Sequence, residues 1–251
     1  MHNWLFENDK GIHHGNSCHK NKTLLWAGTD QEDVFKKNCA NSETLQQLTE
    51  LDWIEPDIIT YKYNNYGFRT PNFDDRPSGL ALGCSFTEGV GLPIDQAWPS
   101  VLSKFCNLQF WNLGIGGGSL DTVFRVLDYY LLKLNVKIVC ILPPSSTRFE
   151  YCEIDGRFTC ISPHNTHHQP EFSKTWLTQS INADINVRKN LLAIQQVCDS
   201  ANVPLFIDYT PPGQYCDRLA RDLSHPGKSA HALLAQGFYD QIILANINFV
   251  D

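Results

Sequence analysis

Short apolar runs alternate with amphipathic stretches from residue 80 to the end of the chain. The run Ile138-Val139-Cys140-Ile141-Leu142 is apolar throughout, which is typical of a strand buried on both faces of a parallel sheet. Three other runs also have the length of buried strands. The pattern therefore predicts four strands, at 80–82, 109–113, 138–142 and 204–209.

The stretches between these strands have apolar residues at helical spacing. Ser119 is a good N-cap for the helix that follows the second strand, and Pro226 is well placed to open the last helix. The long third helix carries residues roughly four apart that predict one helical face, Ile181, Ile185, Arg188, Leu192 and Val197. Helices are expected at 97–105, 120–134, 181–197 and 228–240, and the stretch 143–172 is expected to be irregular.

Strands separated by helices of this length imply right-handed crossovers and a parallel three-layer sheet. The first seventy-odd residues differ from this pattern, with a short helix predicted at 42–51 and an extended segment with a turn at 61–69. No Gly/Ser-rich linker separates them from the rest. We therefore expect an N-terminal appendage, residues 1–78, packed on a main domain of residues 79–251.

A serine follows the first predicted strand, in Gly83-Cys84-Ser85-Phe86-Thr87-Glu88-Gly89. A serine that leaves a buried strand in a tight turn exposes its Oγ at the carboxyl edge of the sheet, where a substrate can reach it. The alternative is an ordinary turn in which the serine caps the chain. Near the other end, Asp222 precedes His225 by three residues, so one local turn can hold a carboxylate against an imidazole. Nucleophile, base and orienting acid are then all present.

A glycine-rich stretch, residues 112–119, follows the second strand and opens the next helix. Backbone N–H groups in such a loop can face an anion. A dinucleotide fingerprint needs glycine at its sixth position, where this chain has Ser119, and an acid near the end of the next strand, where it has Leu142-Pro143-Pro144. An oxyanion hole, in which one loop N–H joins that of Ser85, is the better interpretation.

Composition limits the remaining classes. A net charge of -7 without a basic stripe argues against a nucleic-acid partner, and no run approaches the length of a membrane span. The start of the chain lacks the features of a secretory signal, so we expect a cytoplasmic protein.

The odd count of nine cysteines, without CxxC pairs, favours reduced thiols. Two clusters suggest metal ligands only weakly, so we expect neither metal nor cofactor: His13, His14, Cys18 and His19, and His164, His167 and His168.

Taken together, these stretches resemble the blocks of the SGNH (GDSL-type) hydrolases. Residues 83–89 resemble the nucleophile block, 112–117 the second block and 222–226 the closing Asp-x-x-His-Pro block, while 64–69 resemble a lead-in segment. The resemblance implies a three-layer α/β/α, flavodoxin-like fold. It also implies the roles of five groups: Ser85 as nucleophile, His225 as base, Asp222 as its orienter, and the N–H groups of Ser85 and Gly117 as oxyanion donors.

Two residues depart from the family pattern. Cys84 stands where the family has an aspartate before the serine. After the third strand, Ser145 falls in the slot of the asparagine that serves as a side-chain oxyanion donor. Because Pro143 and Pro144 have no N–H, a third donor must come from Ser145, Ser146 or a long side chain such as Arg148.

The leading functional hypothesis is a serine hydrolase that cleaves a carboxylic ester, of the esterase or deacetylase type. The substrate would be a small-molecule or glycan ester, with carbohydrate O-acetyl groups, lipids and thioesters all open. Two alternatives use the same fold: a non-catalytic protein that binds a glycan or a partner, and an acyltransferase with the same triad.

Overall fold

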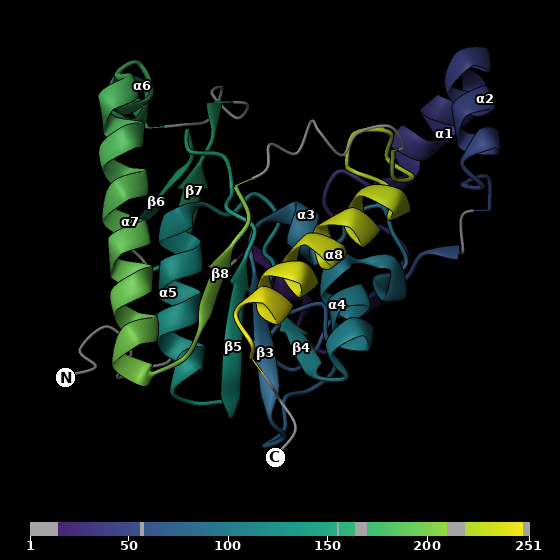
Figure 1. Ribbon diagram of the computed structural model, residues 1–251. Helices are drawn as coiled ribbons and strands as arrows, with labels where there is room; N and C mark the ends of the chain where they lie inside the picture. Colours follow the sequence, from purple (N-terminus) through teal and green to yellow (C-terminus); the bar gives the residue numbers. More distant parts are fainter. Residues whose placement is uncertain (1–14, 56–57, 155, 164–169, 210–218, 248–251) are drawn as a thin grey trace.

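The computed structural model describes residues 15–55, 58–154, 156–163, 170–209 and 219–247 (Figure 1). Its main sheet is parallel, with strands in the spatial order β4-β3-β5-β8. These are the four strands predicted from the apolar runs: β3 (Ser78–Leu82), β4 (Gln109–Asn112), β5 (Val136–Ile141) and β8 (Leu205–Ile207). In order of appearance they are arranged 2-1-3-4, as in flavodoxin-like sheets.

Helices cover both faces of this sheet (Figure 1). α4 (Trp98–Cys106) and α8 (Lys228–Leu244) lie on one face, and α5 (Leu120–Leu131) and α7 (Ser180–Ala201) on the other. Successive side chains of β3 point to opposite faces of the sheet and so contact both helix layers. Leu80 and Leu82 pack with α5 and α7, whereas Ala81 packs with α4 and α8. The predicted three-layer α/β class is therefore confirmed.

Local signals placed the helix ends well. α5 begins directly after Ser119, whose side chain and that of Thr122 form a reciprocal capping box. α4 has Pro99 in its first turn, where the missing N–H costs nothing.

The face that α7 presents to the core differs from the prediction. Ile181, Ile185 and Leu192 are each more than half exposed. The buried positions instead include Asn186 and Asn190, whose side-chain amides each donate to the Asp121 carboxylate of α5 at 2.9 Å. Ile194 and Cys198 are the buried apolar residues of α7, with Val187 and Leu191 packed against the same core, so the buried face combines an apolar stripe with these two polar contacts and differs from the predicted one.

The stretch 143–172, expected to be irregular, contains an antiparallel hairpin of β6 (Phe149–Cys152) and β7 (Phe158–Ile161). It is followed by α6 (Glu171–Leu177), whose Trp176 ring packs on Phe149 with centroids 4.1 Å apart. The hairpin strands are short and their partners lie on helices distant in sequence, so the local pattern was too weak to predict them.

The N-terminal region forms a small cluster of its own against the main sheet domain. Its elements are η2 (Gly15–His19), β1 (Thr23–Leu24), α1 (Glu32–Ala40), α2 (Ser42–Glu50) and β2 (Tyr61–Lys62). The short helix η4 (Ile94–Gln96) comes later in the chain, just before α4. Of these, α2 was predicted and α1 was not. Leu48, Trp53 and Ile59 pack there with Leu92 and Ala220 of the later chain. The domain boundary at residue 78 stays a prediction.

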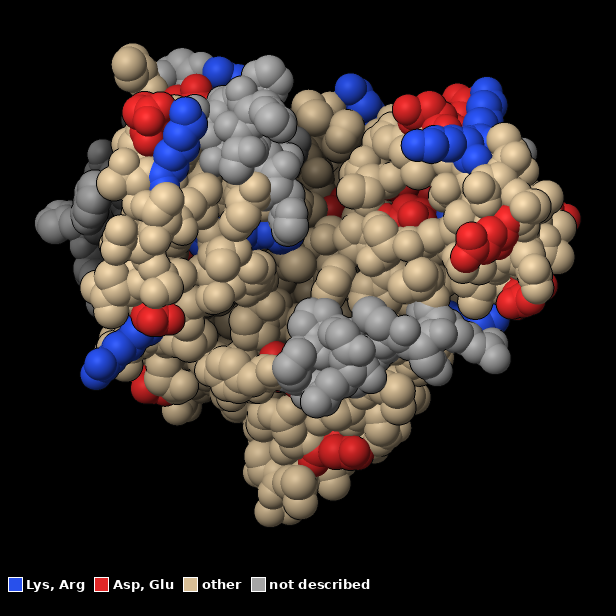
Figure 2. All heavy atoms as spheres, turned by 90° about the horizontal axis from the view of Figure 1, so that it is seen from above, with Lys and Arg blue, Asp and Glu red and all other residues tan. Residues whose placement is uncertain are grey.

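Seen from above the view of Figure 1, the surface is hollowed between the part formed by β6, β7 and α6 and the part formed by α1 and α2 (Figure 2). Acidic and basic side chains are interspersed on this face. Among the helices of the described residues, none is long and apolar enough to cross a membrane.

His231 is buried where α8 meets the start of α4. Its Nδ1 accepts the Trp98 backbone N–H at 3.0 Å, and its Nε2 has no partner within the described chain. Burial lowers the pKa of His231 to about 3, with smaller contributions from the charges of His225 and Arg69. The folded protein therefore holds this imidazole neutral.

This histidine predicts an acid-dependent loss of stability. Its pKa is lower in the folded state than in the unfolded state, about 6.5, so the unfolded state takes up one more proton as the pH falls between the two values. The free energy of unfolding should drop by up to about 1.4 kcal/mol per pH unit from this group. Urea unfolding at several pH values between 7 and 4 measures this dependence. The free energy of unfolding should change less steeply with pH in His231→Gln, which keeps an acceptor for the Trp98 N–H, than in the parent protein. Equal pH dependence in the two proteins would contradict the assignment.

Candidate active site

Ser85 lies at the carboxyl end of β3, as predicted. It is the first residue of the short helix α3 (Ser85–Glu88), which begins immediately after the turn at Gly83 and Cys84. No side chain fits at Gly83, because a Cβ there would lie 2.6 Å from the carbonyl oxygen of Leu142. The close approach of these two strand ends fixes the direction in which Ser85 leaves the sheet.

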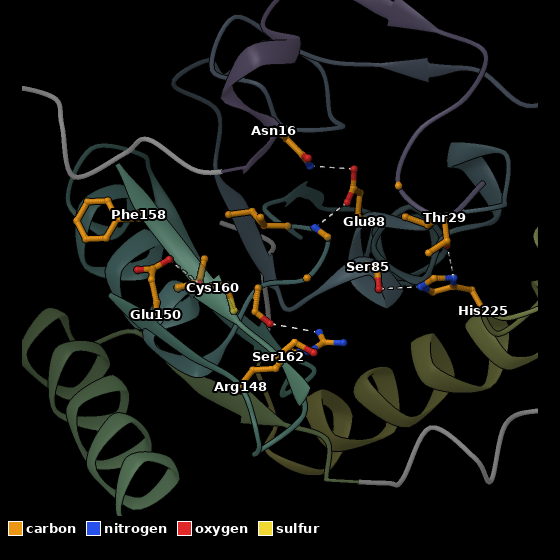
Figure 3. A pocket seen from close by; sticks show the side chains of 17 residues that line it. Asn16, Thr29, Ser85, Glu88, Arg148, Glu150, Phe158, Cys160, Ser162 and His225 are labelled. Carbon is orange, nitrogen blue, oxygen red and sulfur yellow. Dashed lines mark hydrogen bonds between the residues drawn. The ribbon is translucent and has the colours of Figure 1, made fainter. Parts of the chain in front are cut away.

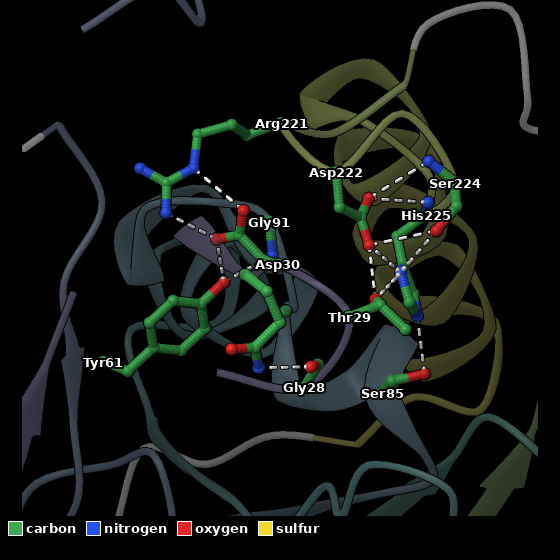
Figure 4. Close-up of polar contacts among 12 residues, drawn as sticks. Gly28, Thr29, Asp30, Tyr61, Ser85, Gly91, Arg221, Asp222, Ser224 and His225 are labelled. Atoms are coloured by element: carbon green, nitrogen blue, oxygen red, sulfur yellow. Dashed lines mark hydrogen bonds and ion pairs between the residues drawn. The ribbon is translucent and has the colours of Figure 1, made fainter. Parts of the chain in front are cut away.

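The structure brings the three predicted residues into one hydrogen-bonded chain; Figure 3 shows Ser85 with His225, and Figure 4 adds Asp222. Ser85 Oγ lies 2.8 Å from His225 Nε2, and His225 Nδ1 lies 2.6 Å from Asp222 Oδ2. The other oxygen, Asp222 Oδ1, accepts the backbone N–H groups of Ser224 at 3.1 Å and His225 at 3.0 Å. One tight turn therefore holds the carboxylate and the imidazole in register. In this geometry the imidazole can take the hydroxyl proton.

Asp222 is buried, but its carboxylate stays ionised. Burial raises its pKa, but hydrogen bonds and the charge of His225, with a further hydrogen bond from Thr29, outweigh that effect and hold the pKa below the usual range. Thr29 Oγ1 donates to Asp222 Oδ2 at 2.5 Å, and Ser224 Oγ donates to the same oxygen at 3.0 Å. Thr29 comes from the N-terminal region, and sequence reasoning missed it.

The residues next to Thr29 and Asp222 form a buried ion pair (Figure 4). Arg221 Nη2 lies 2.6 Å and Nε 2.9 Å from the two oxygens of Asp30, and both side chains are 1% exposed or less. Tyr61 donates its hydroxyl to Asp30 at 2.6 Å, and the Trp26 ring lies 4.0 Å below the guanidinium carbon. This pair fastens the turn that carries Asp222 to the N-terminal region.

The glycine loop after β4 lines the same cavity as Ser85, and one of its N–H groups has no acceptor among the described residues. Gly116 donates to Glu88 Oε2 at 2.8 Å, and Gly118 donates to a carbonyl of its own loop at 3.0 Å. The N–H of Gly117 has no acceptor among the described residues, and a positive φ of 74° turns its peptide out of the loop's own hydrogen bonding. The N–H of Ser85, in the first turn of α3, is likewise without an acceptor there.

Glu88 is a buried carboxylate, 3% exposed, in the wall of the same cavity. Its Oε1 accepts from the Tyr63 hydroxyl and from the Asn16 amide, both at 2.9 Å, and its Oε2 accepts from Gly116. Burial raises the pKa of Glu88 and outweighs the lowering by these donors and by Arg69. Glu88 thus ties the N-terminal region to the glycine loop.

Ser145, predicted as a possible third oxyanion donor, does not reach the site. It is exposed, and its Oγ pairs with Thr147 Oγ1 at 2.9 Å. The Arg148 N–H donates to the Ser145 carbonyl at 3.2 Å, which closes a turn that carries Ser145 outward and returns the chain at Arg148. Arg148 does line the cavity, and its Nη1 lies 3.4 Å from the Gly118 carbonyl (Figure 3).

Three parts of the chain enclose a cavity of about 550 Å³ around Ser85. The sheet edge contributes Ser85 and the glycine loop, the hairpin region contributes Arg148 and Glu150, and the N-terminal region contributes Asn16 and Thr29 (Figure 3). A cavity of this size suits a small molecule or one sugar unit.

The candidate metal ligands of the sequence are not assembled in the described structure. His13, His14, His164, His167 and His168 lie outside the described residues. His19 packs on the Tyr63 ring with centroids 5.1 Å apart. Across the described residues, no group of three His, Cys, Asp or Glu side chains could hold a metal ion, and the cysteines there are free thiols.

No family model and no curated protein matches this sequence. Among solved structures, the psychrotrophic esterase EstA from Pseudoalteromonas sp. is 17% identical, with 69% of this chain and 99% of EstA aligned and a TM-score of 0.39. A putative lipolytic protein of the G-D-S-L family from Desulfitobacterium hafniense is 14% identical, with 65% and 98% aligned and a TM-score of 0.34. AlinE4, an SGNH-hydrolase family esterase, is 15% identical, with 67% and 75% aligned and a TM-score of 0.35. Two of these three proteins carry the G-D-S-L or SGNH family in their names, which is the class that the sequence blocks resemble.

The buried ion pair beside the site predicts a large stability effect. Asp30→Asn leaves the Arg221 guanidinium buried without its countercharge, so the free energy of unfolding should fall by about 3–5 kcal/mol. Urea unfolding measures this, with Asp33→Asn as the matched control, since Asp33 is exposed on α1 and loses the same charge. Equal losses in the two variants would show that the pair does not hold the N-terminal region.

Proposed function

We propose that this protein is a serine hydrolase that cleaves carboxylic esters. The observation that carries the proposal is the hydrogen-bonded chain from Ser85 Oγ through His225 to a buried, ionised Asp222, open to a cavity of about 550 Å³. A serine hydroxyl hydrogen-bonded to an imidazole that a carboxylate orients is the arrangement that activates serine for acyl transfer.

The reaction would proceed in two halves. Ser85 Oγ attacks the ester carbonyl while His225 Nε2 takes its proton, and the tetrahedral intermediate then collapses, with the same proton passing to the departing alcohol. Water next attacks the acyl-enzyme, giving a proton to His225 that returns to Ser85 Oγ as the carboxylic acid leaves. Asp222 accepts the Nδ1–H bond throughout, which keeps Nε2 free as the acceptor in the resting state.

The oxyanion would be stabilised by the N–H groups of Ser85 and Gly117. Both lack acceptors among the described residues and both residues line the cavity. One such donor contributes roughly 2.7–4 kcal/mol to the transition state. Because Ser145 faces outward, the site has two backbone donors where the family pattern has a third from a side chain.

Glu88 acts in this scheme as a positioning residue. By accepting the N–H of Gly116, it would hold the loop in place and so position the next N–H, that of Gly117, for the oxyanion. Both carboxyl oxygens already accept hydrogen bonds, from Tyr63, Asn16 and Gly116, which suits Glu88 to a supporting role.

Labelling with a fluorophosphonate tests the nucleophile. The probe should phosphonylate Ser85 Oγ in the native protein, with loss of fluoride, and the labelled peptide should be identified by mass spectrometry. Ser85→Ala should abolish labelling, whereas Ser162→Ala, a serine lining the same cavity, should keep it. Labelling that survives Ser85→Ala would refute the nucleophile, and a native protein that never labels would favour a binding protein.

Kinetics on para-nitrophenyl acetate extend this test to the whole chain of residues. Ser85→Ala and His225→Ala should each remove nearly all activity, and the double variant should lose little more, because groups that act as one unit are not additive. Losses that multiply would mean that the two residues act independently.

The role of Glu88 predicts that two substitutions of this residue have different effects on kcat. Glu88→Ala frees Gly116 and should lower kcat by about tenfold or more with little change in KM, because the misplaced donor acts only in the transition state. Glu88→Gln keeps an acceptor oxygen for Gly116 and should recover most of kcat. Equal kcat values for both variants and the parent, at unchanged Tm, would rule out the positioning role.

A further inference from the structure

We propose that Arg148 forms a carboxylate-binding subsite in the cavity, so that the preferred ester carries a carboxylate group in addition to the bond cleaved at Ser85. This inference rests on the proposed function and names its substrate class. Arg148 and Ser85 line the same cavity, and the Arg148 side chain extends toward the glycine loop (Figure 3).

The positive charge of Arg148 has no countercharge in the described structure. Its recorded hydrogen bond is a long one, 3.4 Å from Nη1 to the Gly118 carbonyl, and no Asp or Glu of the described residues forms an ion pair with it. Two other arginines near the site are bound bidentately, Arg125 by Glu150 and Arg221 by Asp30. Arg148 therefore keeps donors available to the cavity.

Glu150 is the nearest acid in sequence and could have neutralised Arg148. Both of its oxygens are already occupied, by Arg125 at 2.7 and 2.8 Å and by the Thr122 hydroxyl at 2.8 Å. The Arg125 guanidinium also lies 3.9 Å from the Phe158 ring centroid, which fixes it in place. Glu88, the other Glu lining the cavity, accepts hydrogen bonds from Tyr63, Asn16 and Gly116, and within the described residues it forms no ion pair with Arg148.

The chemistry of a guanidinium selects an anion. Arginine stays protonated at every accessible pH, and its planar fork of N–H groups matches the two oxygens of a carboxylate. Arg148 is the sole Lys or Arg among the described residues that line the cavity. One positive charge in a cavity that Glu150 and Glu88 also line suits a monoanion better than a phosphate dianion. A second negative charge on the ligand would be repelled by these two acidic side chains.

Arg148 has a competing role, because a donor beside Gly118 could instead serve as the third oxyanion donor. The two roles predict different kinetics. An oxyanion donor accelerates all esters alike, whereas a carboxylate subsite accelerates only esters that carry the anion. The measured quantity is therefore a preference, the ratio of kcat/KM for an anionic ester to that for a matched neutral ester.

Two substrate pairs distinguish an anion in the acyl part from one in the alcohol part. Mono-para-nitrophenyl succinate is compared with para-nitrophenyl butanoate, and para-acetoxybenzoate with its methyl ester. Comparing each preference between parent and variant cancels the intrinsic reactivity of the esters. Arg148→Gln removes the charge, Arg148→Lys keeps it without the fork, and Arg157→Gln is the matched control, since Arg157 pairs with Glu153 on the exposed end of the hairpin.

In Arg148→Gln the preference should fall about tenfold or more for one of the two pairs, which identifies the part of the ester that carries the anion. Arg148→Lys should retain part of the preference, and Arg157→Gln should retain all of it. Unchanged preferences in Arg148→Gln would overturn the subsite, and an equal loss of kcat for charged and neutral esters would assign Arg148 to the oxyanion hole instead.

A binding measurement keeps the subsite testable if the parent protein hydrolyses no ester. Calorimetry with the Ser85→Ala protein should show tighter binding of mono-para-nitrophenyl succinate than of para-nitrophenyl butanoate, and this difference should disappear in Ser85→Ala/Arg148→Gln. Retained discrimination in the double variant would overturn the subsite. Discrimination by Ser85→Ala without turnover by the parent would refute the hydrolase and leave an anion-binding site.

Discussion

The buried pair of Asp30 and Arg221 is the interaction on which the candidate active site depends. Removing two charges from water is costly, and it is offset here by bidentate geometry, the Tyr61 hydroxyl and the Trp26 ring. The pair joins residues 191 positions apart and sets Thr29 beside Asp222. The N-terminal region thereby contributes a hydrogen bond to the acid that orients His225, as well as covering the sheet edge.

The same region also reaches the opposite side of Ser85. Asn16 and Tyr63 hold Glu88, which in turn holds the glycine loop. The two acids flanking Ser85 have opposite environments: hydrogen bonds and the charge of His225 outweigh burial at Asp222, whereas burial dominates at Glu88. One acid is kept ionised beside the His225 imidazole, and the other serves as a buried acceptor, although the N-terminal region donates hydrogen bonds to both.

The sequence predicted what depends on local pattern, and it missed what depends on distant partners. Apolar runs predicted the four strands, and one capping residue, Ser119, predicted the start of α5. The place of Ser85 after the first strand and the three-residue spacing of Asp222 and His225 predicted that these side chains meet at the sheet edge. The hydrogen bond of Asn186 to Asp121 joins two helices far apart in sequence, and Thr29 enters the site through a partner 193 positions away. Neither contact leaves a periodic signal, so propensity and spacing could not predict them.

The departure from the family pattern after β5 follows from one turn. Closure of the chain from Ser145 to Arg148 puts a short hydroxyl outside and a cation inside, where the family has a neutral amide. An oxyanion hole with two backbone donors loses transition-state stabilisation. A carboxylate held by Arg148 would restore catalytic efficiency by another route, because binding energy from a remote part of the substrate fixes the ester carbonyl against Ser85. In this protein, selectivity for an anionic ester and catalysis by a reduced oxyanion hole would thus have the same structural origin.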